Sequence, residues 1–131
     1  MMWARSFLVV EGILFALAGA WSLLRSIERG HDAGLVFVPP AARVESMAIQ
    51  GGLRLGLGAF LAWSAVRKAY LTAGLLAVLF GALATGLARA LALATLGPFG
   101  PIGATSLALE FGSAILAGLF LRSVLRDARL G

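Results

Sequence analysis

The 131-residue chain is 60% hydrophobic and only 13% charged, with a mean hydropathy of +0.95 and a formal net charge of +5. A soluble domain carries about 25% charged residues, so this composition excludes a small water-soluble globule and predicts an integral membrane protein. Without cysteine and with one histidine, His31, the chain is expected to hold no disulfide, metal or cofactor, and its basic residues are expected to meet lipid headgroups rather than nucleic acid.

The first expected membrane helix covers residues 6–24, an apolar run interrupted by Glu11. A spanning helix needs about 20 predominantly apolar residues, and this run is close to that length. The alternative is a secretory signal peptide, with Arg5 as its basic start and small residues at 18–20 as the cleavage site. Because Glu11 lies inside the apolar run, we expect a retained helix.

A long connection is expected over residues 26–45. It contains a short apolar stretch, residues 35–38, directly before Pro39 and Pro40. Proline stops a helix, and four residues are too few to span a bilayer. We expect the stretch to lie on the membrane surface or to cap the helices.

Three further helices are expected over residues 47–66, 70–96 and 102–121. A basic turn at residues 67–68 separates the first two, and a turn rich in glycine and proline at residues 97–101 separates the last two. Short connections make consecutive helices antiparallel neighbours.

Together these elements predict one all-α domain over residues 1–131, an integral membrane four-helix bundle with antiparallel up-down topology. Four spans place both termini and the second connection on one side, where six Lys or Arg residues flank the helices, against three on the other side. The more basic side of a membrane protein normally faces the cytoplasm. We therefore expect a multi-pass protein of the cell membrane with both termini cytoplasmic.

Small residues at helical spacing allow membrane helices to approach closely, and each expected helix has such residues. The glycines expected at helix contacts are Gly12, Gly19, Gly51, Gly52, Gly56, Gly81 and Gly86. The four-residue spacing of Gly52 and Gly56 is also typical of dimer contacts, so a homo-oligomer remains an alternative.

Charged residues inside the expected helices are informative, because a charge at a helix centre costs about 2.5–3.5 kcal/mol on insertion. Counted from the outer side, Arg54 and Glu110 lie at nearly the same depth. This predicts an ion pair between them inside the bundle, with Gln50 one turn from Arg54 as a third member.

The remaining charges are Arg89, for which Glu45 is the expected counter-charge, and Glu11, which has no equally clear partner. Glu11 is therefore the candidate for proton-coupled chemistry. The expected ligand-binding residues or buried polar network are Glu11, Glu45, Gln50, Arg54, Arg89 and Glu110.

The sequence resembles domain-of-unknown-function family 4345, a branch of the DoxX-like superfamily of small four-helix membrane proteins. The resemblance covers the second to fourth expected helices and implies a shared framework made of Glu45, Gly51, Gly52, Arg89 and Glu110. It implies the fold but no activity, because no activity is established for the family.

Three functions are weighed for such a chain. The favoured one is an accessory or ligand-binding bundle that holds a lipid or a quinone-like molecule, with membrane lipid, a larger membrane complex or further copies of the chain as partners. The alternatives are a proton-coupled small-molecule transporter that uses Glu11, and a membrane enzyme whose Arg54 and Arg89 hold an anionic cofactor. An enzyme is less favoured, because the sequence has no Ser/His/Asp set or nucleotide-binding glycine loop.

Overall fold

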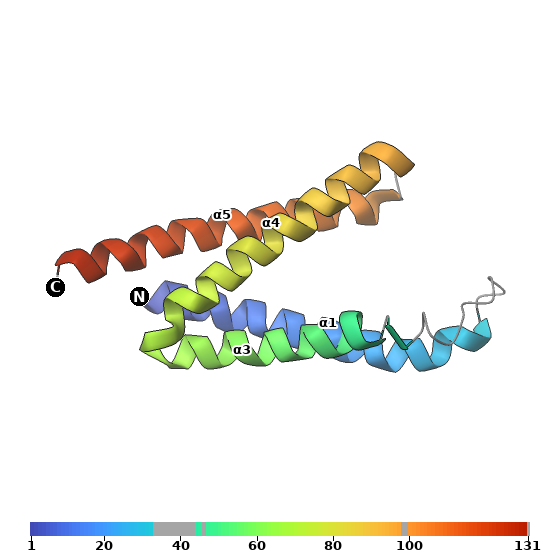
Figure 1. The fold of residues 1–131 in the computed structure, drawn as a ribbon, viewed down its shortest axis with the longest axis horizontal. Coiled ribbons are helices and arrows are strands. Elements are labelled where there is room, and N and C mark those ends of the chain that lie inside the picture. The colour runs from blue at the N-terminus through green and yellow to red at the C-terminus, as the bar shows by residue number, and fades with distance from the viewer. Residues whose placement is uncertain (33–43, 46, 98–99, 131) are drawn as a thin grey trace.

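The computed structural model describes residues 1–32, 44–45, 47–97 and 100–130, and nearly all of these residues lie in helices. In chain order these are α1 (Met2–Asp32), the π-helix η1 (Met47–Leu53), α3 (Arg54–Val66), the short 3₁₀-helix η2 (Lys68–Tyr70), α4 (Leu71–Leu96) and α5 (Gly100–Leu130) (Figure 1). The predicted all-α class with four helices is confirmed. The expected surface stretch at residues 35–38 lies outside the described residues.

Among the described residues, three helices are long and apolar enough to cross a membrane: Met2–Leu24, Lys68–Thr95 and Ala104–Ala128. At 1.5 Å per residue they reach about 34 to 42 Å, more than the roughly 30 Å of a hydrocarbon core. The fourth expected span, residues 47–66, is divided between a seven-residue π-helix and the thirteen-residue α3, so neither part qualifies by itself.

Two helices are longer than the sequence predicts. The connection was expected to begin at residue 26, but α1 continues to Asp32, and α5 continues past the expected end at residue 121 to Leu130. Hydropathy marks only where apolar residues stop. In the α5 extension, residues 122–130, Leu, Ala and Arg favour helix whether or not they lie in hydrocarbon. Gly97 follows the end of α4 with φ of 86°, in the left-handed region that glycine adopts without steric cost.

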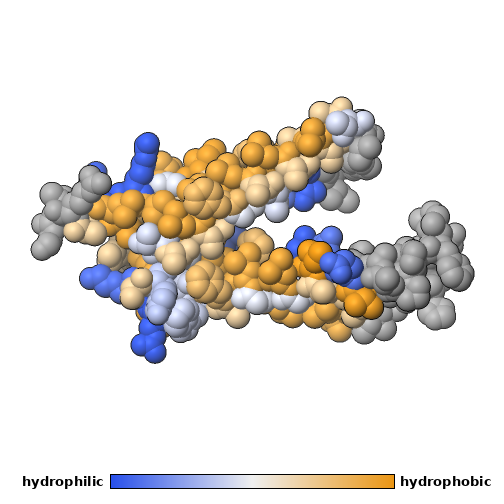
Figure 2. All heavy atoms as spheres, in the orientation of Figure 1, coloured by the Kyte–Doolittle hydropathy of each residue, from blue (hydrophilic) through white to orange (hydrophobic). Residues whose placement is uncertain are grey.

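The helices are arranged as two pairs that meet at one end and diverge toward the other (Figure 1). One pair is α1 with α3, and the other is α4 with α5. Both termini and the turn from α3 to α4 lie at the closed end (Figure 1). In the space-filling view the two pairs separate into two largely apolar arms (Figure 2).

The apolar core lies at the closed end, where α1, α3, α4 and α5 all meet. Its buried members are Ala4, Leu8, Leu61, Ala65, Leu71, Leu75, Val78, Ala117 and Val124. Many large apolar side chains elsewhere are exposed, among them Leu17, Phe80 and Leu119. A surface of this kind suits contact with lipid tails, which solvate apolar side chains as well as a protein core does.

Two pairs of glycines bring α1 into close contact with η1 and α3. A Cβ on Gly58 would lie 2.6 Å from the carbonyl oxygen of Gly12, and a Cβ on Gly19 would lie 2.8 Å from the carbonyl oxygen of Gly51. Gly12 and Gly19 of α1 are seven residues apart, about two helical turns, and the same spacing separates Gly51 of η1 from Gly58 of α3. The earlier glycine of α1, Gly12, contacts the later glycine, Gly58, and Gly19 contacts Gly51. The segment formed by η1 and α3 therefore runs antiparallel to α1.

Other glycines that were expected at helix contacts do not lie there. A Cβ on Gly52, Gly56 or Gly81 would meet nothing within 4 Å, whereas a Cβ on Gly86 would lie 3.4 Å from the ring of Phe111. In the second expected helix, Gly52 and Gly56 were expected at a contact because of their four-residue spacing. The glycines that contact α1 are Gly51 and Gly58.

The buried hydroxyl of Ser64 gives a first prediction. Ser64 is fully buried in the core, and its Oγ has no hydrogen-bond partner among the described residues. An unpaired buried hydroxyl costs about 1–3 kcal/mol. We expect Ser64→Ala to raise the free energy of unfolding in detergent by about 1 kcal/mol, while the same change at the exposed Ser6 leaves it within about 0.5 kcal/mol. A Ser64→Ala protein that melts below the parent would contradict this.

Candidate functional site

A cavity of about 360 Å³ is lined by residues from all four helices and borders the core at Val78. Its volume falls within the range of about 300–1,000 Å³ that small-molecule sites occupy. Much of its wall is apolar, formed by Leu14, Phe15, Ala18, Val78, Ala82 and Leu109. The polar groups in the wall are Glu11, Arg54, Thr85, Arg89, Ser106, Glu110 and Ser113.

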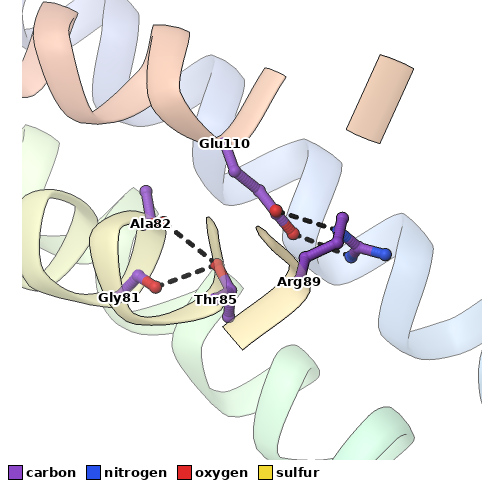
Figure 3. A network of polar contacts seen from close by, with 5 residues as sticks. All are labelled: Gly81, Ala82, Thr85, Arg89 and Glu110. Carbon is purple, nitrogen blue, oxygen red and sulfur yellow. Dashed lines mark hydrogen bonds and ion pairs between the residues drawn. The ribbon is translucent and has the colours of Figure 1, made fainter. Parts of the chain in front are cut away.

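The strongest polar contact in the wall joins Arg89 of α4 to Glu110 of α5 (Figure 3). Arg89 Nε donates to Oε2 at 2.9 Å, and Nη2 donates to Oε1 at 2.8 Å. Such a two-pronged contact between a guanidinium and a carboxylate fixes geometry as well as charge. It binds α4 to α5 at the edge of the cavity.

The predicted ion pair was wrong in its partner and in its burial. Glu110 pairs with Arg89 rather than with Arg54, and the Arg89 and Glu110 side chains are 39% and 18% exposed, so the pair is not buried. Arg54 and Glu110 were expected at similar depths on the second and fourth helices, but α5, which carries Glu110, packs along α4. Shared depth does not select a partner when the two helices are not neighbours.

Thr85 lies one turn before Arg89 and is satisfied within its own helix. Its hydroxyl donates toward the carbonyl oxygens of Gly81 and Ala82, at 3.0 and 3.2 Å (Figure 3). A hydroxyl oxygen has two lone pairs, so Thr85 still offers an acceptor to the cavity.

Glu11 of α1 is 8% exposed and reaches across to α5, where the Ser113 hydroxyl donates to its Oε1 at 2.6 Å. This is the length typical of a hydroxyl bound to a carboxylate. Glu11 was expected as a site residue from the sequence, whereas Ser113 was not. A signal was present, because Ser106, Glu110 and Ser113 recur at the four- and three-residue spacing of one helix face.

Arg54 is the first residue of α3 and directly follows the π-helix η1. Its side chain lines the cavity, yet within the described part of the chain it takes part in no hydrogen bond or ion pair. The expected neighbour Gln50 is exposed and does not line the cavity. Glu45, the expected counter-charge of Arg89, is also exposed and lies outside the wall.

The family of the chain follows from a match over residues 3–121 to the family described as Domain of unknown function (DUF4345). The chain belongs to the DUF4345 family. This confirms the first part of the resemblance and extends it to α1, so the matched region contains every residue that lines the cavity. No curated protein and no solved structure matches this DUF4345 protein.

The cavity of the DUF4345 protein combines groups that can form ion pairs and hydrogen bonds with apolar side chains. The wall offers two guanidinium groups, two carboxylates and three hydroxyls beside apolar side chains. Across the described residues no group of three His, Cys, Asp or Glu side chains could hold a metal ion. The arrangement therefore suits a molecule with a polar head and an apolar body.

Proposed function

We propose that this DUF4345 protein is an integral membrane binding protein that holds a small amphipathic molecule, a lipid or a quinone-like compound, between its two helix pairs. The observation that carries the proposal is the cavity of about 360 Å³, to which every long helix contributes. Apolar walls with a few convergent polar groups are the common pattern of small-molecule sites. A membrane supplies such ligands at high local concentration.

The proposal includes four membrane crossings, with η1 and α3 together as the second, both termini in the cytoplasm, and a place in the DoxX-like superfamily. The distribution of basic residues supports the orientation, because Lys and Arg concentrate on the cytoplasmic side of membrane proteins, whereas Trp and Tyr mark both membrane interfaces. Near the closed end the rings of Trp63 and Tyr70 lie 4.3 Å apart. The basic residues of this end are Arg5, Arg67, Lys68, Arg122 and Arg126.

Filling the cavity tests the proposal. Ala82 lines the cavity and is buried, whereas Ala84, two residues along the same helix, is exposed and outside the wall. We expect native mass spectrometry in mild detergent to find a bound small molecule in the parent and in Ala84→Phe, and to find it lost from Ala82→Phe. A ligand-free parent, or equal retention in both variants, would overturn the proposal.

A proton-coupled transporter is the second candidate, favoured by the burial of Glu11 in the cavity wall. A carboxylate inside a membrane protein commonly belongs to a proton or ion pathway. This alternative predicts uptake of the bound molecule into proteoliposomes driven by a pH gradient, and loss of that uptake in Glu11→Gln. Binding without gradient-driven flux would assign the protein to the binding class.

A further inference from the structure

The charges in the cavity wall that have no charged partner among the described residues indicate which class of head group the cavity would bind. The bidentate contact between Arg89 and Glu110 neutralises one cation and one anion. The two remaining charges in the wall are the guanidinium of Arg54, on α3, and the carboxylate of Glu11, on α1.

Neither remaining charge has a charged partner among the described residues. The described partner of Glu11 is a neutral hydroxyl, that of Ser113, which occupies Oε1. Arg54 has five N–H donors, and none of them is used within the part of the chain that the structure describes. A charge without an opposite charge is costly inside a membrane, so a ligand that compensates both would gain most from binding.

The possible ligand classes differ in how many of these two charges they satisfy. A neutral quinone offers only hydrogen bonds and leaves both charges in place. A fatty acid or another monoanion pairs with Arg54 but is repelled by Glu11. A monocation pairs with Glu11 but is repelled by Arg54. A zwitterion satisfies both at once, with its anionic group toward Arg54 and its ammonium toward Glu11.

We propose that the ligand has a zwitterionic head, an ammonium that carries N–H donors close to a phosphate or carboxylate. This inference rests on the proposed binding function. Two sources share this chemistry: an aminophospholipid of the phosphatidylethanolamine type and a free zwitterion without acyl chains. The apolar part of the wall, which includes Leu14, Phe15 and Leu109, provides contact for an acyl chain.

Binding measurements on the purified full-length protein in detergent test the proposal. The probes are short-chain phosphatidylethanolamine, short-chain phosphatidylglycerol as the anionic lipid, a decyl quinone as the neutral compound, and glycerophosphoethanolamine as the head without chains. We expect phosphatidylethanolamine to bind at least tenfold more tightly than phosphatidylglycerol or the quinone. Glycerophosphoethanolamine that binds as tightly as the lipid would support the zwitterion and assign a soluble source.

Variants of the two charged residues assign the contacts. Arg54→Gln and Glu11→Gln are each expected to weaken phosphatidylethanolamine binding at least tenfold. Glu11→Gln should also reduce the ratio of the affinity for phosphatidylethanolamine to the affinity for phosphatidylglycerol. Arg54→Lys and Glu11→Asp, which keep the charges, should retain the preference for phosphatidylethanolamine. Glu45→Gln, a carboxylate change outside the cavity, should leave all affinities unchanged.

The outcomes separate this inference from the proposed function. Phosphatidylglycerol or quinone binding as tight as phosphatidylethanolamine binding, and abolished by Ala82→Phe, would overturn the zwitterionic head and leave the binding function standing. No binding of any probe would overturn both. Unchanged phosphatidylethanolamine affinity in folded Glu11→Gln and Arg54→Gln would also overturn the zwitterionic head.

Discussion

Gly58→Ala is expected to destabilise the protein by about 2–3 kcal/mol, because the added methyl group would overlap backbone atoms of α1. Its Cβ would lie 2.6 Å from the carbonyl oxygen of Gly12 and 2.7 Å from the amide nitrogen of Ala16. Backbone atoms cannot rotate away as a side chain can, so α1 and α3 must separate. Thermal unfolding in one detergent, followed by circular dichroism, measures the effect.

Gly56→Ala is the matched control on the same helix. A Cβ at Gly56 would meet nothing within 4 Å, and alanine favours a helix over glycine by about 0.8–1.0 kcal/mol. We expect this variant to unfold at the parent temperature or slightly above it. Equal losses in the two variants would show that the contact between α1 and α3 is not the one described.

Glu110→Gln is expected to lower the free energy of unfolding by about 2 kcal/mol, because it removes the charge that faces Arg89 and weakens two charge-assisted hydrogen bonds. The partial exposure of the pair keeps this figure below that of a fully buried pair. Chemical or thermal unfolding in detergent provides the measurement. Glu45→Gln, an exposed carboxylate change, should have an effect within about 0.5 kcal/mol.

Exchanging the charges of Arg89 and Glu110 tests whether the stability depends on their pairing or only on having polar side chains at these positions. Arg89→Glu alone should destabilise more than Glu110→Gln, since it places two carboxylates side by side. Adding Glu110→Arg to it should restore much of the lost stability. A double variant no more stable than the Arg89→Glu single variant would show that the two residues do not stabilise each other.

The helices were predictable from the sequence because apolar length alone determines which segments can cross a bilayer. The runs that became α1, α4 and α5 satisfy that condition, and their positions were anticipated. The division of residues 47–66 was not anticipated, since hydropathy does not register a π-helix. The lengths of α1 and α5 were underestimated for the same reason: helix formation continues where the apolar run stops.

The contacts between helices were less predictable, because they depend on which faces meet. Gly12 and Gly19 were expected at a contact and lie at one, but their partners on the second helix include Gly58, which the four-residue pattern passed over. Arg89 and Glu110 were both selected as charges that need partners, yet their pairing follows from the packing of α5 along α4. The rotation of a helix about its axis depends on all the contacts at the interface. A single sequence shows only the spacing of small or apolar residues along that helix.

Thiol accessibility tests the polar cavity most directly, because the chain has no cysteine of its own. Thr85 lines the cavity, whereas Leu87, two residues along α4, is exposed outside the wall. A maleimide reacts with a thiolate, which forms in a hydrated polar site and not in lipid. In native membranes, Thr85→Cys is predicted to react with a membrane-permeant maleimide at least tenfold faster than Leu87→Cys. Equal rates, or a faster reaction at residue 87, would contradict a polar cavity between the helix pairs.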